Sequence, residues 1–421
     1  MREMKDSGIE WIGTVPEDWE VSKIDVLYNL RNTKVSDRDY QALSVTKQGI
    51  LPQLENVAKT NDGDSRKLVM VNDFVINSRS DRRGSCGISV YEGSVSLINT
   101  VLMPNEEIKM NNQYYDWLFH TTNFSDEFYK WGHGIVDDLW TTGWQEMRKI
   151  VVTYPPLSEQ NKIAAFLDKK CGQIDKLSEK LQGEIEKLQE YKKSLISETV
   201  TQGLDKNVAM KDSGVDWIGK IPKHWEMHPT YVYFEEHKNI NYRGKENNLL
   251  SLSYGKIIRK DINTNGGLLP ENFNGYNIVE KDNIVFRLTD LQNDKKSLRT
   301  GLVTEKGIIT SAYITLQKKE DIHVPFYNYL YHSYDVKKVF YNMGGGVRQG
   351  LNYAELSKLM LVNPPLAEQQ AIAAFLDDKC SQLDAVIAKK QQQVSILADY
   401  KKSLIYEYVT GKKEVTADEV H

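Results

Sequence analysis

The strongest constraint on the fold is a segment that occurs twice in the chain. Residues 155–201 read PPLSEQNKIAAFLDKKCGQIDKLSEKLQGEIEKLQEYKKSLISETVT, and residues 364–410 read PPLAEQQAIAAFLDDKCSQLDAVIAKKQQQVSILADYKKSLIYEYVT. The two copies align without a gap at a constant offset of 209 residues. A self-match at one fixed offset identifies a tandem repeat, so the chain is expected to fold as two related halves.

Each copy is predicted to form one long helix that begins just after a Pro-Pro pair. Apolar residues recur every seven positions, and Leu177 and Tyr191 mark an adjoining row. Seven is the period of a coiled coil, and about forty residues at ~1.5 Å rise give a helix of ~60 Å. We expect the two helices to pair, because two helices buried separately would show a period nearer 3.6. We expect the pair to be antiparallel, because the tandem copies each join a head at one end of the helix and would then hold the heads apart. The residues predicted to pair them are Ile174, Leu177, Leu181, Leu188, Leu195, Leu383, Val386, Leu397 and Leu404. Lys390 interrupts the row in the second copy at the position of Leu181.

A second, shorter element is also repeated. Residues 4–21 read MKDSGIEWIGTVPEDWEV, and residues 210–227 read MKDSGVDWIGKIPKHWEM. Each copy holds a Trp-Ile-Gly, a Pro and a second Trp, which suits either a docking strap or a staple that buries its aromatics in the domain. The staple is favoured. The second copy follows the first long helix after a polar linker, so the order is strap, globular head and helix, twice.

The two heads, about residues 22–153 and 228–362, differ far more than the helices do. Short β-branched runs bounded by Gly, Asn and Asp predict strands at 69–76, 88–91, 95–102, 284–286, 302–304 and 308–316. Aromatics at helical spacing near 114–129 and 326–341 are expected in the core and not on a base-stacking surface. The predicted class is α+β: two target-recognition domains joined by two long antiparallel coiled-coil helices in a pseudo-twofold tandem repeat. The predicted boundaries are 1–154, 155–203, 204–363 and 364–412, with a disordered tail at 413–421.

Composition limits the function classes. The 421 residues suffice for two or three domains, and the net charge of −4 is not that of a strongly basic nucleic-acid binder. Any contact with DNA must therefore come from local basic loops. The three cysteines, the absence of a recognisable signal peptide and the absence of a long apolar run predict a reduced, cytoplasmic protein without membrane segments.

The PPL(S/A)EQ, AAFLD and YKKSLI helix motifs and the WIG straps resemble those of the specificity subunit of type I restriction–modification enzymes. The resemblance covers nearly the whole chain. It implies that each head reads one half of a bipartite site on double-stranded DNA, while the helices space the halves and dock two modification (methyltransferase) subunits. It also implies restriction subunits for translocation and cleavage. The adenine methylation and the ATP-dependent nuclease chemistry, with S-adenosylmethionine, ATP and magnesium, would then belong to partner subunits and none to this chain.

No sequence motif indicates catalysis by the chain itself. Asn363-Pro364-Pro365-Leu366 resembles the Asn-Pro-Pro-aromatic motif of amino-methyltransferases, but its fourth residue is Leu and the first copy has Tyr154 in place of Asn. The Gly-rich run 344–346 lies in no phosphate-binding motif, and no His/Cys set has zinc spacing. We therefore predict a non-catalytic binding protein.

DNA recognition requires Arg, Gln or Asn for base edges and Lys, Arg or hydroxyl groups for phosphates. The candidates in the first head are Thr46, Lys47, Gln48, Arg79, Arg82 and Arg83. Those in the second head are Tyr254, Lys256, Arg259, Lys260, Arg287, Lys295, Lys296, Arg299, Arg348 and Gln349. Any one of these charges could equally be an ordinary solvated surface group. The alternative function is a coiled-coil adaptor whose heads bind proteins; the acidic pI favours it slightly, and the family resemblance favours DNA binding.

Overall fold

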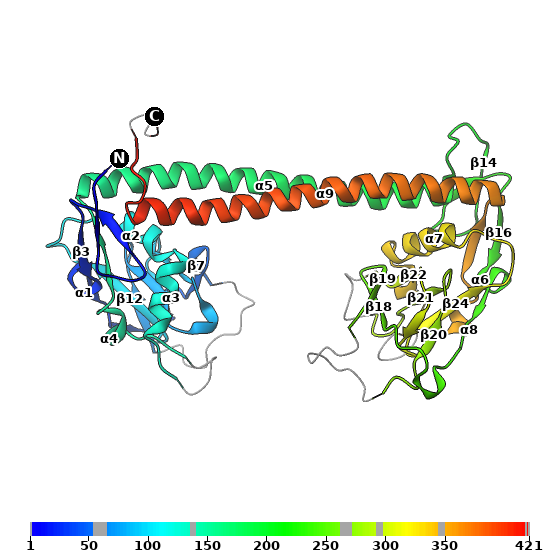
Figure 1. Ribbon diagram of the computed structural model, residues 1–421, viewed down its shortest axis with the longest axis horizontal. Helices are drawn as coiled ribbons and strands as arrows, with labels where there is room; N and C mark the ends of the chain where they lie inside the picture. The colour runs from blue at the N-terminus through cyan, green and yellow to red at the C-terminus, as the bar shows by residue number, and fades with distance from the viewer. Residues whose placement is uncertain are drawn as a thin grey trace. The chain divides into compact units, whose positions relative to one another are not determined.

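The computed structural model describes residues 2–53, 65–134, 140–261, 272–291, 298–343, 350–416 and 419 (Figure 1). The chain divides into two compact units, Met1–Gln182 with Gln391–His421 and Gly183–Lys390. Each unit holds one head, one strap and part of each long helix. Strands and helices are mixed in both heads, which confirms the predicted α+β class and the tandem repeat. Among the described residues, no helix has the length and apolar character needed to cross a membrane.

The first unit contains the strap and head 1. Its elements are β1 (Met4–Asp6), β2 (Thr14–Pro16), β3 (Glu20–Lys23), α1 (Ile24–Leu27), β4 (Tyr28–Leu30), β5 (Lys34–Val35), β6 (Leu43–Thr46), β7 (Gly49–Pro52), β8 (Arg66–Val69), β9 (Phe74–Asn77), η1 (Ser80–Arg82), β10 (Cys86–Ile88), β11 (Gly93–Ser96), β12 (Asn99–Pro104), α2 (Asn112–Phe119), α3 (Thr122–Lys130), α4 (Trp144–Met147) and β13 (Val151–Tyr154).

The second unit repeats this plan in head 2. Its elements are β14 (Met210–Asp212), β15 (Lys220–Pro222), β16 (Glu226–Pro229), α6 (Thr230–Tyr233), β17 (Phe234–Glu236), η3 (Tyr242–Gly244), β18 (Leu250–Ser253), β19 (Lys256–Arg259), β20 (Asn277–Val279), β21 (Ile284–Phe286), β22 (Thr300–Leu302), β23 (Gly307–Ile309), β24 (Ile314–Lys318), α7 (Val324–Val336), η4 (Val339–Asn342), α8 (Tyr353–Leu356) and β25 (Met360–Asn363).

The largest sheet has the same antiparallel order in both heads. It runs β4-β12-β9-β10 in head 1 and β17-β24-β21-β22 in head 2. The predicted strand 284–286 is confirmed as β21, whereas the other predicted strands lie near observed strands but differ from them in extent. The run 69–76 is split by a turn in which Asn72 has φ +74°, and the runs 95–102 and 308–316 each cover two strands. Strand 302–304 begins earlier, at Thr300, and 88–91 is replaced by β10.

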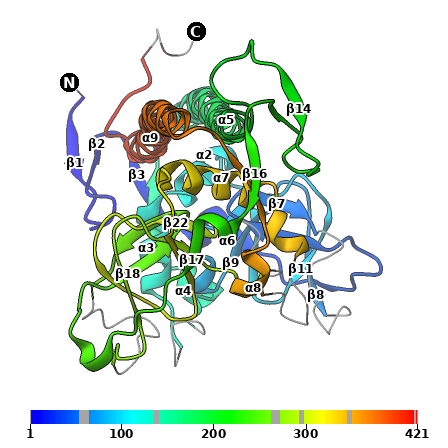
Figure 2. The same cartoon turned by 90° about the vertical axis from the view of Figure 1, so that its right-hand side faces the viewer.

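Aromatic side chains form the main core of each head. Tyr114, Tyr115 and Phe124 in head 1 and Phe326 and Tyr331 in head 2 are buried. The prediction that these helical aromatics belong to the core is confirmed. In head 2, α7 lies between the sheet and the long helices (Figure 2), and Ser333 on α7 contacts Ser197 of α5 with 3.0 Å between the hydroxyl oxygens.

The two repeated sequence motifs bind each other. Trp19 of the first strap is fully buried, and its indole Nε1 donates to the carboxylate of Glu159 at 2.5 Å. In the second unit Trp225 donates to Glu368 at 2.9 Å. The straps are therefore staples that fix the start of each long helix, as favoured from the sequence.

The glutamine of each PPL(S/A)EQ motif fixes the same helix start to its head. Gln160 donates to Pro155 O and accepts from Asn111 N, each at 2.8 Å. Gln369 donates to Pro364 O and accepts from His323 N, each at 2.9 Å. Asn111 and His323 are the N-caps of α2 and α7, so each head helix is tied to the beginning of a long helix.

The long helices are α5 (Leu157–Gln202) and α9 (Leu366–Val409), and within each unit they pair antiparallel. In the first unit Asp175 of α5 accepts from Lys401 of α9 at 2.6 Å. In the second unit Lys192 of α5 donates to Asp384 of α9 at 2.6 Å. The two ion pairs occupy equivalent positions of the repeat. The predicted break at Lys390 is accommodated by an ion pair to Glu184 at 2.5 Å.

One of the two predicted rows of the helix seam is wrong. Leu177 and Val386 are 47% and 44% exposed, and so cannot be seam residues. The second row lies four residues after the first, not three, and includes Cys171 and Ile185 in α5 and Cys380 and Ile387 in α9, all buried. The row of Ile174, Leu181, Leu188, Leu195, Leu383, Leu397 and Leu404 is buried or half-buried.

The end of α9 returns to the first head. The Val409 carbonyl accepts from Tyr114 Oη at 2.7 Å and from Thr153 Oγ1 at 3.0 Å. Part of the tail predicted to be disordered also packs here: Lys413 pairs with Glu407 at 2.6 Å, and Glu419 accepts from Tyr408 Oη at 3.1 Å.

Candidate nucleic-acid interface

The hairpin loop after the central strand is built in the same way in both heads. In head 1, β9 and β10 are closed at the loop base by Asn77 N donating to Ser85 O at 2.9 Å. In head 2, β21 and β22 are closed by Arg287 N donating to Arg299 O at 2.9 Å. These loops contain several of the predicted DNA-contacting residues, and the second is the longer of the two.

A second loop joins the first one in each head. In head 1, Thr142 N donates to Ser78 O at 2.9 Å, and Ser80 N donates to Trp140 O at 3.0 Å. In head 2, Leu351 N donates to Leu288 O at 3.0 Å. The loops that follow α3 and η4 are thus attached to the hairpin loops, and each head presents a composite surface made of two segments far apart in sequence.

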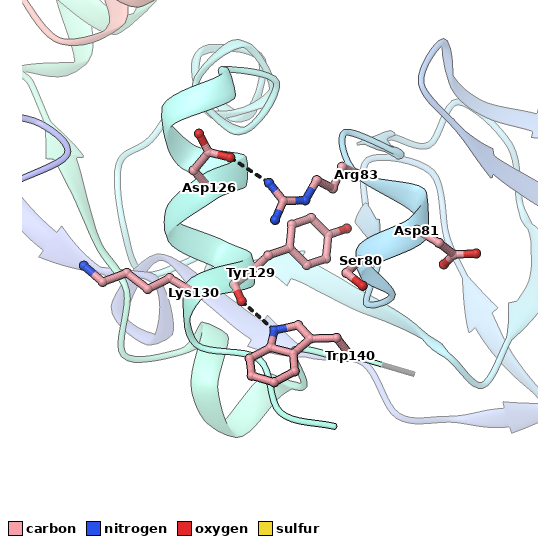
Figure 3. Close-up of a pocket in the computed structure, with 7 residues that line it drawn as sticks. All are labelled: Ser80, Asp81, Arg83, Asp126, Tyr129, Lys130 and Trp140. Atoms are coloured by element: carbon pink, nitrogen blue, oxygen red, sulfur yellow. Dashed lines mark hydrogen bonds and ion pairs between the residues drawn. The ribbon is translucent and has the colours of Figure 1, made fainter. Parts of the chain in front are cut away.

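In head 1 this surface is an open pocket of about 820 Å³ (Figure 3). It is lined by Ser80, Asp81, Arg83, Asp126, Tyr129, Lys130 and Trp140. Three of these side chains come from α3, three from the hairpin loop, and Trp140 from the second loop. The lining combines two cations, two carboxylates and two aromatic rings.

Arg83 is held by two groups on α3. Its guanidinium donates to Asp126 Oδ1 at 2.8 Å and lies over the ring of Tyr129, 5.2 Å from the centroid. The Arg83 side chain is 55% exposed. One ion pair leaves other N–H groups of the planar fork available, and the ring below restricts its direction.

The two aromatic residues are fixed by backbone contacts. Burial raises the pKa of Tyr129, so its hydroxyl stays protonated and donates to Asn77 O at 3.0 Å. Trp140 Nε1 donates to Tyr129 O at 2.8 Å. Gly132 allows this approach, because a Cβ there would lie 2.4 Å from Trp140 Nε1. The pocket is therefore prearranged around Arg83.

Such an arrangement suits recognition of a guanine edge or a phosphate. A planar arginine fork can donate two parallel hydrogen bonds to guanine O6 and N7, and Lys130 and Ser80 can serve phosphate oxygens. Asp81 and Asp126 offset the cations, so this site would bind through geometry and not through a large positive charge.

The other predicted residues of head 1 lie on neighbouring loops. Arg79 and Arg82 flank Asp81, at 3.2 and 3.6 Å between nitrogen and carboxylate oxygen. Thr46 closes the β6–β7 turn by donating to Gly49 O at 2.9 Å, while Lys47 and Gln48 are exposed at its tip. This turn packs closely on β10. The backbones of Gly49 and Gly87 approach so closely that a Cβ on Gly87 would lie 3.0 Å from Gly49 Cα.

Head 2 separates residues that were predicted as one group. Tyr254 is 74% exposed at the β18–β19 turn, and the next residue, Gly255, packs against Leu298 at the loop base. Arg259 lies at the opposite end of this hairpin, where it pairs with Glu305. Lys256 is near the turn and Lys260 follows Arg259, both exposed, whereas Arg287 is half-buried.

One predicted contact in head 2 is wrong. Arg299 is fully buried, so in this conformation it cannot touch DNA. Its side chain donates to the backbone carbonyls of Thr289 and Asp290, at the start of the hairpin loop. Lys295, Lys296, Arg348 and Gln349 lie outside the described residues.

Asp126, Tyr129, Lys130 and Trp140 were missed by the sequence reasoning. Tyr129 was assigned to the core, which is correct for its burial but leaves out the face that supports Arg83. The Arg83–Asp126 pair joins residues 43 positions apart, and no local pattern marks it.

Two structural observations concern metal binding and the Asn-Pro-Pro motif. The part of the chain that the structure describes holds no group of three or more His, Cys, Asp and Glu side chains that could bind a metal ion. Asn363 of the Asn-Pro-Pro motif accepts from Tyr327 Oη at 2.8 Å and from Gln369 Nε2 at 3.1 Å. Its amide oxygen is used to hold the start of α9.

Comparison with known proteins gives a consistent result over both halves. Residues 16–187 and 226–395 each match the family described as the type I restriction modification DNA specificity domain. Two proteins of Methanocaldococcus jannaschii, named as MjaX and MjaVIII type I restriction enzyme specificity subunits, are 23% and 25% identical. The matches cover 96% and 95% of this chain and 96% and 94% of the relatives. A chain solved in a study of complex assembly and conformational transition of the type I R-M system shares the fold. Its TM-score is 0.71 at 11% identity, covering 95% of this chain and 99% of that one.

Proposed function

Because the chain belongs to the family of type I restriction–modification specificity subunits, with two tandem DNA recognition domains, we propose that each head binds one half of a bipartite site on double-stranded DNA. The observation that carries this proposal is the equivalent pair of joined loops in the two heads. Among the described residues the two heads share two backbone connections, one closing the hairpin loop and one joining the second loop to it, but their side chains differ. Equal frames with different side chains suit two half-sites of different sequence.

The chain itself would have no catalytic role. Specificity subunits are the non-catalytic components of these systems, and we propose that adenine methylation and ATP-dependent cleavage belong to modification and restriction subunits. S-adenosylmethionine, ATP and magnesium would be bound by those partners. A site for two modification subunits can be argued from the long helices.

The exposed side of the helix pair carries equivalent apolar residues in the two units. Leu177 and Tyr400 in the first unit are 47% and 53% exposed. Their repeat equivalents, Val386 and Tyr191 in the second unit, are 44% and 56% exposed. Leu177 lies two residues after Asp175, and Tyr400 lies one residue before its ion-pair partner Lys401. In an antiparallel pair these two residues reach the same level.

These residues lie on the flank of the seam away from the head. Trp117 of head 1 donates to Asp168 of α5 at 2.8 Å, and Asp168 follows the buried seam residue Leu167. Leu177 instead comes directly before a position of the second seam row, the row of Cys171 and Ile185. A residue before a seam position and a residue after one lie on opposite flanks of the helix. We propose that each unit docks one modification subunit on this flank, since equivalent surfaces fit two identical partners.

DNA binding by the assembled complex tests the proposal. The chain and its modification subunit are mixed with labelled duplex, and the affinity is measured between about 50 and 200 mM salt. Phosphate contacts give a linear fall of log affinity with log salt concentration. A protein–protein adaptor would show no specific DNA complex, and that result would contradict the proposal.

A further inference from the structure

A tyrosine ring beneath an arginine occurs at the equivalent place in both heads. The Phe-Tyr pairs 128–129 and 340–341 end the helical segment in each head. Arg83 lies over the ring of Tyr129 at 5.2 Å, and Arg299 lies over the ring of Tyr341 at 6.0 Å. Arg83 is more than half exposed, whereas Arg299 is fully buried. The same platform therefore holds an outward arginine in head 1 and an inward arginine in head 2.

The buried guanidinium is used to hold the loop that precedes it. Arg299 Nη1 donates to Thr289 O at 2.9 Å and to Arg287 O at 3.4 Å. Its Nη2 donates to Asp290 O at 3.3 Å. Asp290 has φ +55°, in the left-handed region where a non-glycine residue is strained. Arginine, with its several donors in one plane, can satisfy converging carbonyls that no neutral side chain of this size could serve.

The backbone at Arg299 is also anchored to the helix beneath it. Arg299 N donates to the buried carboxylate of Asp335 on α7. Ser333 on the same helix contacts Ser197 of α5 at 3.0 Å. Arg299 thus connects the start of the loop to α7, and α7 in turn contacts the long helix of the same unit through Ser333. Head 1 has Ser85 at this position, and its shorter loop has no such arginine beneath it.

The geometry points to Arg299 as a positioning residue for the second half-site: as a buried residue it fixes the backbone of residues 287–290, where the hairpin loop of head 2 begins. This inference rests on the proposed DNA binding. The inference assigns a role in DNA specificity to a buried residue. It also means that the equivalent tyrosine rings, Tyr129 and Tyr341, support an arginine with a different role in each head. Head 1 exposes its arginine at the pocket, and head 2 buries its arginine against the start of the hairpin loop.

The test compares two substitutions at Arg299 with a matched control. Arg299→Met removes every donor, and Arg299→Lys keeps the charge but loses the planar fork. Arg66→Met removes another buried arginine, which donates to Ser94 Oγ and Ser94 O at 2.9 Å and belongs to β8 of head 1. Each variant is assembled with the modification subunit. Its affinity is measured for the cognate duplex and for duplexes with changes in one half-site only.

Both Arg299 variants should lose about tenfold or more of their discrimination in the half-site read by head 2. Discrimination in the other half should stay within about twofold, and Arg66→Met should leave both halves unchanged even if it lowers Tm. If Arg299→Met does not fold, Arg299→Lys supplies the same comparison. Unchanged discrimination in a folded variant, or an equal loss in both halves, would overturn the inference. A wild-type complex that binds no DNA would refute the proposed function instead.

Discussion

At the residue scale, the sharpest prediction about DNA specificity concerns the orientation of the Arg83 guanidinium. Asp126 and the ring of Tyr129 hold Arg83 in place, while Arg82 beside it is 66% exposed. Replacing Arg83 with Lys keeps the charge and removes the planar fork. Discrimination at one base pair of the half-site read by head 1 should fall by about 1–3 kcal/mol. Competition binding with single-base variants of the duplex measures this.

The matched control is Arg82→Lys on the same loop. It should change the affinity for all duplexes slightly and equally, because an exposed cation near a phosphate carries no base information. Equal effects of the two substitutions at every base pair would show that Arg83 is also a phosphate contact only.

A half-buried histidine in head 2, His332, gives a prediction about acid stability. Burial, with a smaller effect from Lys192, lowers the pKa of His332 from 6.5 to about 4. The folded protein therefore keeps His332 neutral while the unfolded chain takes up a proton below about pH 6.5. The contribution of neutral His332 to the unfolding free energy is fully present above pH 6.5 and is lost as the pH falls towards 4.

By pH 5 this residue should account for a loss of about 2 kcal/mol of unfolding free energy. Denaturant unfolding at pH 7.5 and pH 5 is compared between the wild-type chain and His332→Gln, which cannot take up the proton. The wild type should lose about 2 kcal/mol more than the variant. Identical pH dependence of the two proteins would mean that His332 is solvated in the folded state.

The sequence identified Arg83 but not its supports, for a physical reason. A basic loop rich in Ser and Gly is visible as a local pattern, whereas Asp126 and Trp140 meet the loop only through the fold. The same limit explains Arg299: the segment around it has the composition of a DNA-contacting loop, but Asp335 and three backbone carbonyls hold the residue in a buried position.

At the scale of the elements, the period of the helices was predictable and one of their two faces was not. The row that begins at Leu177 and the row that begins at Cys171 each repeat every seven residues, and each is partly apolar. The period alone cannot separate a seam from an exposed apolar row. Only the packing of α5 against the partner helix and the head decides between them.

Two substitutions on one turn of α9 separate pairing from docking. Leu404 is 4% exposed in the core, and Tyr400 is 53% exposed one turn earlier. Leu404→Lys should cost about 3 kcal/mol or more, because it buries a charge in a packed core. Tyr400→Lys should change the unfolding free energy by less than about 0.5 kcal/mol but weaken binding of the modification subunit.

Thermal unfolding and a titration with the modification subunit measure the two effects separately. A Tyr400→Lys chain that binds the subunit as tightly as wild type does would exclude this flank as the docking surface.

The errors in strand prediction also belong to the scale of the elements. A β-branched run such as 95–102 contains a tight turn, and local strand propensity does not indicate where the chain reverses.

At the scale of the whole molecule, the account depends on duplication. The staples, the glutamines at the helix starts and the Asp–Lys pairs are repeated, and their geometry is nearly the same in the two units. The heads share their strand order but differ in the loops that would meet DNA. This division of the chain into a repeated frame and two different reading surfaces is what allows two half-sites to be read independently.

The most direct measurement is methylated-adenine mapping after exchange of one head. Residues 22–153 are replaced by the corresponding head of a related specificity subunit, with both straps, both helices and residues 228–362 unchanged. The variant is expressed with its modification subunit, and the methylated motif is determined genome-wide. The account predicts that one half of the motif changes and the other half stays the same. A motif altered in both halves, in an active complex, would contradict independent reading by the two heads.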